Sequence, residues 1–194
     1  MSAGAARGGE SLVWMSPPLE QIWGDICRAR ESLVQEVLGL SDGQLAFRPS
    51  AEVWSIGEIL DHLFLAEQSI ARVLSKILQQ AAGRSLIGSP GSMAFPVHQL
   101  DLAVYNEAAV APESVRPLPN RSLEPLLKAL AESRDRLLQV AKRVDGQVVG
   151  NFTLRHFQLG DLNFYQWLAL EAAHETKHLQ QVRRLKVHPD FPGA

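Results

Sequence analysis

The stretch HETKH, residues 174–178, combines residue types and a spacing that could do chemistry. Two histidines four residues apart project from one face of a helix and can share a metal ion. With Glu175 between them they form the His-Glu-x-x-His pattern of zinc proteases. The longer metzincin pattern would place its third histidine at position 184, where this chain has Arg184. No upstream edge strand offers to hold a peptide, so the protease interpretation fails.

A third ligand must therefore come from elsewhere in the chain. His98 lies in a long loop, His156 precedes the last predicted helix, and His188 stands before a proline. His62 differs from these because it falls in a predicted helix, beside the apolar stripe. A histidine near an apolar face is usually a satisfied core residue. The alternative is a metal site in the bundle core, built by His62 and the pair on another helix.

Two carboxylates near the histidine pair are the catalytic candidates. Glu175 is either a solvated charge or a base that leans toward the metal. Glu171 lies one turn before His174, where it either orients an imidazole N–H or forms a surface ion pair. Gln181 is three residues past His178 and is a candidate polar residue of the site lining.

The elements that must position these residues are helices. Four segments carry the apolar period of a helix, with bounds near residues 16–39, 54–77, 122–144 and 161–186. Ser55 and Glu58 fit a capping box at the start of the second segment, and a role for Glu58 near the metal is the minor alternative. No segment alternates convincingly as a strand, although residues 146–154 could form a short extended piece.

The predicted domain organisation is one four-helix bundle over residues 16–188. Residues 1–15 read as a flexible tail of small residues, and 189–194 as a C-terminal tail. A connection rich in Pro, Gly and Ser spans 83–121, and connections of that length are usually functional or wrap the domain. It permits a crossover, so we expect it to cross one end of the bundle and to cover part of the site.

Composition and charge argue against nucleic acid and membranes as partners and favour a cytoplasmic protein. The net charge is −2, without a basic patch for nucleic acid or a Lys/Arg-rich face for a membrane surface. No apolar run reaches the roughly 18 residues of a membrane span, and the N-terminus does not resemble a secretory signal. The single cysteine, Cys27, cannot form an intramolecular disulfide and fits a reducing cytoplasm.

Two stretches resemble the DinB/YfiT-like superfamily. LSDGQLAFRPSAEVWSIGEILDHLFLAE, residues 40–67, is similar to its second-helix region, with a Trp-Ser opening and a histidine eight residues after the tryptophan. LGDLNFYQWLALEAAHETKHLQQV, residues 159–182, is similar to its last helix. The resemblance implies an all-α four-helix bundle, often dimeric, with a divalent metal held by three histidines. Those positions correspond here to His62, His174 and His178.

The resemblance also implies a class of chemistry. Some members of the superfamily are thiol-dependent transferases or isomerases, and many have no known substrate. Three neutral imidazoles favour zinc or nickel over magnesium or calcium and leave a position open to hydroxide or a thiolate. We therefore expect a metal-dependent transferase of a low-molecular-weight thiol, or a hydrolase, acting on a small molecule. The alternative is a metal-containing binding or stress-response module without turnover.

Overall fold

The computed structural model describes residues 17–82, 110–119, 121–144, 149 and 151–193. Its body is a bundle of four long helices: α1 (Pro17–Val37), α3 (Ile56–Ala82), α5 (Leu123–Lys142) and α6 (Phe164–Lys186). The predicted all-α bundle is confirmed. The predicted tail 1–15, His98 and most of the 83–121 connection lie outside the described residues. In the part that is described, no helix is long and apolar enough to cross a membrane.

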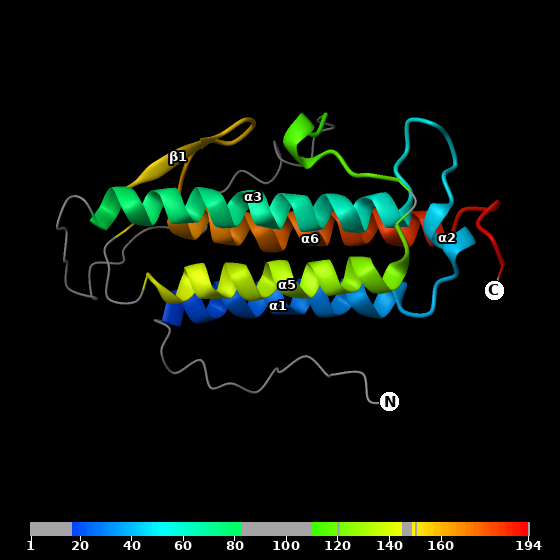
Figure 1. Cartoon of the computed structure of the whole chain (residues 1–194), viewed down its shortest axis with the longest axis horizontal. Helices are drawn as coiled ribbons and strands as arrows, with labels where there is room; N and C mark the ends of the chain where they lie inside the picture. The colour runs from blue at the N-terminus through cyan, green and yellow to red at the C-terminus, as the bar shows by residue number, and fades with distance from the viewer. Residues whose placement is uncertain (1–16, 83–109, 120, 145–148, 150, 194) are drawn as a thin grey trace.

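The four helices form two layers, with α3 and α6 in one and α1 and α5 in the other (Figure 1). Helix α1 packs on α6, and α3 packs on both α5 and α6. Helices α3 and α5 begin at the same end of the bundle and run parallel (Figure 1). The end of α3 and the start of α5 therefore lie at opposite ends of the bundle, as the predicted crossover requires (Figure 1).

The starts of two of the long helices are set by capping boxes. At α3 the Glu58 backbone N–H donates to Ser55 Oγ, and the Ser55 N–H donates to the Glu58 carboxylate at 2.8 Å. The predicted capping role of Glu58 is therefore present. Helix α6 is capped in the same way by Asn163 and Gln166. Its predicted start at Asp161 is wrong by three residues, because Asn163 has extended backbone and belongs to a strand.

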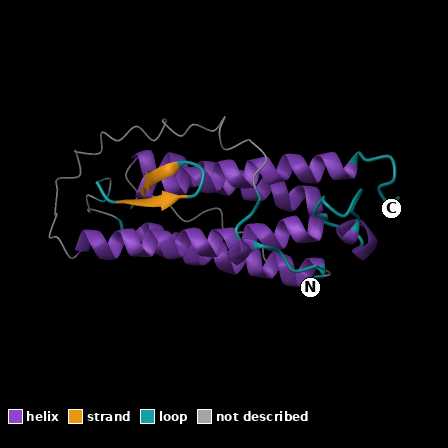
Figure 2. Cartoon of the chain, turned by 90° about the horizontal axis from the view of Figure 1, so that it is seen from above, coloured by secondary structure: helices purple, strands orange, loops and turns teal. Residues whose placement is uncertain are grey.

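A small β-hairpin precedes α6 and was not predicted as such. Strand β1 (Thr153–His156) pairs antiparallel with β2 (Gly160–Asn163). Gly160 sits at the turn with a φ of +76°, a conformation that favours glycine. Each strand has only four residues, too few for an alternating pattern to stand out. The hairpin lies on the side of α3 and α6 (Figures 1 and 2), where the Trp167 indole donates to the Leu154 carbonyl.

Two short helices complete the described chain. Helix α2 (Asp42–Ala46) is capped by Ser41 and Gln44, and η3 (Glu113–Val115) is a single 3₁₀ turn. The Gln44 amide donates to the Pro192 carbonyl at 3.0 Å, and Phe191 meets the Phe47 ring edge-on. The residues after α6, predicted to be a tail, therefore pack against the end of the bundle near α2.

The apolar core is divided along the bundle. One cluster, which includes Ile26 and Leu137, occupies the hairpin end. A second cluster, which includes Leu33 and Leu130, occupies the α2 end. On every long helix the residues between the two clusters include a buried or half-buried ionisable side chain, namely Arg30, Glu67, Arg134, Glu171 and Glu175. The middle of the bundle is therefore polar.

Candidate metal centre

Three histidine side chains meet between α3 and α6. His62 lies on α3, and His174 and His178 lie one turn apart on α6. Nε2 of His174 is 3.1 Å from Nε2 of His62 and 3.0 Å from Nε2 of His178. All three candidate ligand atoms lie within 4.8 Å of one another. The fold thus brings together the three histidines that the resemblance pointed to.

The outer ring nitrogens of two histidines are held by acceptors. Nδ1 of His62 is 2.7 Å from the Val115 carbonyl oxygen, and Nδ1 of His178 is 2.6 Å from Gln181 Oε1. A carbonyl oxygen can only accept, so each Nδ1 must carry the ring proton. In the neutral rings the proton is then absent from Nε2. Both Nε2 lone pairs therefore face the centre of the cluster.

This arrangement of donors fits a divalent metal ion. Nε2 of His174 can supply at most one proton, so it can satisfy only one of the two lone pairs that face it. A cation among the three nitrogens would satisfy both. The spacings of 3.0 and 3.1 Å are close to the roughly 3.4 Å between two nitrogens bound about 2.1 Å from a tetrahedral ion. The residues present therefore match a three-nitrogen site with further positions open.

Burial keeps the three rings neutral, which is the form that binds metal. It lowers the pKa of His178 to about 3, with a further contribution from His62. Burial also lowers the pKa of His174 well below its ordinary value, and the other two histidines add to the effect. The pKa of His62 is lowered by burial as well, although its bond to the Val115 carbonyl opposes the shift. Protons therefore compete weakly for these nitrogens at neutral pH.

The histidines open onto a cavity of about 880 Å³. Its walls come from α3, α6, the hairpin, the segment around η3 and the loop before α3. Besides the three histidines, the lining includes Trp54, Val115, His156, Trp167 and Gln181. A volume of this size lies within the range that holds a small molecule.

The described last part of the long connection, residues 110–119, covers part of the site, which is what we expected of this connection. Val115 reaches His62 because Asp61 anchors the chain that follows η3. The Asp61 carboxylate accepts the Leu118 N–H at 2.7 Å and pairs with Arg121. Asp61 is buried and directly precedes His62. The same turn of α3 therefore carries the candidate metal ligand His62 and holds the segment whose carbonyl orients that ligand.

Aromatic side chains pack around the histidines. The Trp54 ring lies 4.8 Å from His62, centroid to centroid, and is stacked with His178 at 6.4 Å. His156 packs against Trp167, and its Nδ1 accepts the backbone N–H groups of Gln158 and Leu159. The proton of neutral His156 must then be on Nε2. His156 lines the cavity, but it is not one of the three clustered ligands.

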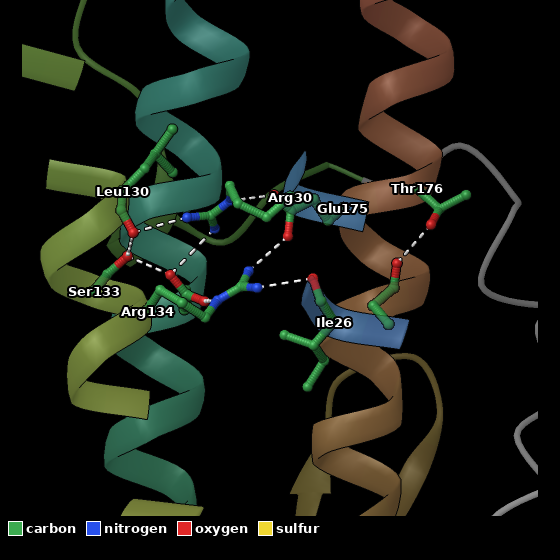
Figure 3. A network of polar contacts seen from close by, with 9 residues as sticks. Ile26, Arg30, Leu130, Ser133, Arg134, Glu175 and Thr176 are labelled. Carbon is green, nitrogen blue, oxygen red and sulfur yellow. Dashed lines mark hydrogen bonds and ion pairs between the residues drawn. The ribbon is translucent and has the colours of Figure 1, made fainter. Parts of the chain in front are cut away.

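Glu175 lies in a buried ion network that joins all four long helices. Its carboxylate accepts from Arg30 Nε and from Arg134 Nη2, the latter at 2.7 Å (Figure 3). The same two arginines pair with Glu67 on α3. The solvated-charge interpretation of Glu175 is wrong, because its side chain is fully buried. Its candidate role as a base has no support in this position: both oxygens are engaged, and Glu175 is not among the described residues that line the cavity.

Glu171 is also buried in the bundle, one turn before Glu175. Neither carboxyl oxygen has a hydrogen-bond partner among the described residues, so the predicted surface ion pair is absent. No bond orients a histidine either. Burial raises the pKa of Glu171 well above its ordinary value, and the charge of Glu67 adds to the shift. When Glu171 is protonated it carries no charge. The two carboxylates of the network, Glu67 and Glu175, then balance the charges of its two arginines.

Several residues of the site were not found from the sequence. The Val115 carbonyl could not be, because a backbone carbonyl carries no signature. In the sequence Trp54 marks the opening of the second helical segment, and only the fold shows its stacking on His178. Lys177 and Arg184 line the cavity. Lys177 is three residues past His174 and Arg184 is three residues past Gln181, and this helical spacing is a signal that could have found them.

The sequence and the fold were both compared with those of known proteins. The family model described as the DinB superfamily matches residues 26–182. The chain belongs to the DinB superfamily. It is 27% identical over 162 residues to an uncharacterized protein YuaE of Bacillus subtilis, covering 81% of this chain and 93% of that one. The solved structure of TT2238, a four-helix bundle protein, superposes with a TM-score of 0.59 at 20% identity, covering 86% of this chain and 98% of TT2238.

Membership of the DinB superfamily agrees with the fold and with the resemblance noted in the sequence. The match spans His62, His174 and His178 and reaches from within α1 to near the end of α6. The likeness to TT2238 supports the four-helix fold alone.

Proposed function

We propose that this DinB protein is a metal-dependent enzyme that transfers a small thiol to an electrophile or hydrolyses a small molecule. The observation that carries the proposal is the convergence of three imidazole nitrogens on a cavity. A bound divalent ion would supply Lewis acidity, which favours the anionic form of a thiol or of water. Zinc or nickel fits the three neutral nitrogen donors best.

The chain's own residues prepare the site for such an ion. Val115 and Gln181 hold the outer nitrogens of His62 and His178, which sets the tautomer and the orientation of both rings. Trp54 packs on the same two rings and restricts their rotation. The ligands are therefore arranged before an ion binds, and little ordering remains to oppose binding.

Two reactions fit this site. In the thiol reaction, the thiol proton goes to solvent, the sulfur lone pair forms a bond to the electrophilic carbon, and the leaving group departs with its bonding electrons. In hydrolysis, the water oxygen forms the new bond to an acyl carbon, the bond from that carbon to the leaving group breaks, and the leaving group takes up a proton from the water. The cavity walls hold the two reactants together, which raises their effective concentration.

A metal-containing binding module without turnover is the competing proposal. One observation favours it: Glu171 and Glu175, the carboxylates nearest the histidine pair in sequence, are buried away from the cavity lining. The cavity beside the histidines favours the enzyme, because a module that only stores a metal needs no space of about 880 Å³. The two proposals differ in whether metal-dependent turnover is measurable.

The test compares His178→Ala with His188→Ala. Both histidines line the cavity, but only His178 belongs to the cluster. We expect His178→Ala to lose its metal, measured by elemental analysis, while His188→Ala retains it. Thiol conjugation and ester or amide hydrolysis are then assayed on each protein. Full metal content in His178→Ala would refute the proposed metal site. Rates that do not depend on metal would refute the enzyme and favour the binding module without turnover.

Two further expectations accompany this proposal. The resemblance implies a homodimer, which sedimentation velocity would detect. We also expect the protein to be cytoplasmic and to act on a small molecule, without binding nucleic acid or a membrane. Fractionation of cells that produce the protein checks the compartment.

A further inference from the structure

The cavity follows one face of α6 from end to end. Trp167, Leu170, His174, His178, Gln181 and Arg184 recur every three or four residues along that helix, and all of them line the cavity. With a rise of 1.5 Å per residue, positions 167 and 184 lie about 25 Å apart along the helix axis. The histidine cluster falls between them, so a ligand at the cluster can extend in two directions.

Toward the hairpin, the cavity wall is mainly apolar. Trp167 and Leu170 are buried on α6, and Ile70 faces them from α3. Phe157 at the turn of the hairpin and Val110 before η3 also line the cavity, and both leave large apolar surfaces exposed. Exposed apolar side chains at the mouth of a cavity mark a surface that an apolar group can cover.

Toward the end of α6 the charged lining residues are mostly basic. Arg184 lines this half, Lys177 lines the cavity at the level of the histidine cluster, and Glu52 is the carboxylate on the cavity wall among the described residues. Glu52 accepts a hydrogen bond from the Ser50 hydroxyl at 2.7 Å. Arg184 forms no ion pair within the described part of the chain. Its neighbour Arg183 is paired with Glu36 on α1 at 2.8 Å.

We infer that the cavity binds its ligands in a fixed direction, with an anionic group at Arg184 and Lys177 and an apolar group at the hairpin end. Lys177 and Arg184 are seven residues apart, two turns along the same face of α6. Both cations attract a carboxylate, and the guanidinium can bind it in a bidentate manner. The assignment of the two groups to two reactants rests on the proposed function. In that function the thiol carries the carboxylate, and the electrophile carries the apolar group. The binding directions themselves do not depend on turnover.

The charged half is tested with two thiols of equal length. Binding of 3-mercaptopropionate and of 3-mercaptopropanamide to the metal-loaded protein is measured by calorimetry at low salt, because salt screens such attraction. We expect the carboxylate to bind about fivefold more tightly than the amide. Arg184→Gln should remove most of this preference without changing the affinity for the amide.

Arg183→Gln is the matched control, because it removes the same charge one residue away, from a side chain that does not line the cavity. It should keep the preference. Equal binding of the two thiols to the unchanged protein would overturn the inference. So would an unchanged preference in Arg184→Gln, or an equal loss in both variants, since the effect would then be one of net charge.

A second pair of probes separates this inference from the proposed function. The pair 4-phenylbutyrate and 4-phenylbutanamide carries no thiol. If the thiols fail to bind but phenylbutyrate keeps a preference that depends on Arg184, the thiol reaction is wrong and the charged half stands. If neither pair shows the preference, the charged half is wrong whatever the reaction.

The apolar half is tested with a pair of neutral probes, 1-butanol and 4-phenyl-1-butanol, because one short molecule cannot reach both Arg184 and the hairpin end. Covering the phenyl ring with Phe157 and Trp167 should make 4-phenyl-1-butanol bind about tenfold more tightly than 1-butanol. Phe157→Ser should remove much of this gain. Leu118→Ser is the control, because Leu118 is similarly exposed but does not line the cavity. A gain that survives in Phe157→Ser and falls in Leu118→Ser would place the apolar group elsewhere.

Discussion

At the scale of single residues, the site depends on which atom of each histidine carries the proton. His62 and His178 are held by acceptors at Nδ1, so their Nε2 lone pairs point inward. The two acceptors differ in kind: one is a backbone carbonyl that no substitution removes, and the other is the side chain of Gln181. Gln181 is therefore the part of this arrangement that mutation can test directly.

Gln181→Leu should weaken metal binding by about 10- to 100-fold, the usual cost of losing such an orienting partner. The reason is that His178 becomes free to rotate and to place its proton on Nε2. Competition with a chromophoric chelator measures the affinity. Gln180→Leu is the control, because Gln180 is exposed and does not line the cavity. Equal affinities in the two variants would show that the Gln181 contact does not orient the ligand.

Glu171 provides a second residue-scale prediction, for stability against pH. Its pKa is raised well above the ordinary value in the folded protein, mainly by burial. Above the unfolded pKa of about 4.3, the folded state therefore holds a proton that the unfolded state has lost. The contribution of Glu171 to stability is present at low pH and declines as the pH rises toward the folded pKa.

In Glu171→Gln this decline should be absent. The unfolding free energy of the variant, relative to the unchanged protein, should rise by up to about 1.4 kcal/mol per pH unit above pH 5. Urea unfolding at pH 5, 6, 7 and 8, with both proteins in the same metal state, measures the difference. Curves that stay parallel would mean that Glu171 is ionised in the folded protein.

At the scale of elements, the segment around η3 connects the crossover to the ligands. Asp61 accepts the Leu118 N–H and pairs with Arg121, and this contact keeps the Val115 carbonyl against His62. The hairpin is attached differently, by the Trp167 indole at the Leu154 carbonyl. The segment around η3 is therefore held on α3 through Asp61 and His62, and the hairpin on α6 through Trp167.

Asp61→Ala should lower the unfolding free energy by about 1–3 kcal/mol, because it leaves the Leu118 N–H without its acceptor. It should also weaken metal binding, since Val115 is no longer held against His62. Asp61→Asn keeps an oxygen for Leu118 and should lose less of both. Chemical unfolding and chelator competition measure the two effects. A variant that loses stability but keeps full metal affinity would show that η3 does not position His62.

At the scale of the whole molecule, an ionic layer divides the core into two apolar clusters. Arg30, Glu67, Arg134 and Glu175 come one from each long helix. Burial opposes the ionisation of Glu67, yet Arg30 and Arg134 together lower its pKa. Burial likewise opposes the charge of Arg134, but Glu67 and Glu175 raise its pKa. The layer is stable as a set, because each member compensates for the burial of the others.

Glu175→Gln should destabilise the fold by about 3–5 kcal/mol, because it leaves two guanidiniums around one carboxylate. Thermal and chemical unfolding measure the loss. At a temperature where the variant is folded, its metal content should be unchanged, since Glu175 does not line the cavity. Loss of metal or of turnover without loss of stability would instead support the role of Glu175 as a base.

The sequence alone determined the helices and the pair His174 and His178, because apolar periods, capping boxes and the His-x-x-x-His spacing are local. The resemblance to a known family added His62 as the third candidate ligand. Tertiary structure decided the roles of Glu175, Glu171 and Val115. Whether a carboxylate faces solvent, metal or arginine depends on which helices pack against it, and this chain places Arg30 and Arg134 there from helices distant in sequence. The strands of the hairpin were too short for periodicity to reveal. Every residue has a backbone carbonyl, so the sequence could not single out the Val115 carbonyl that contacts His62. Only the path of the folded chain places it there.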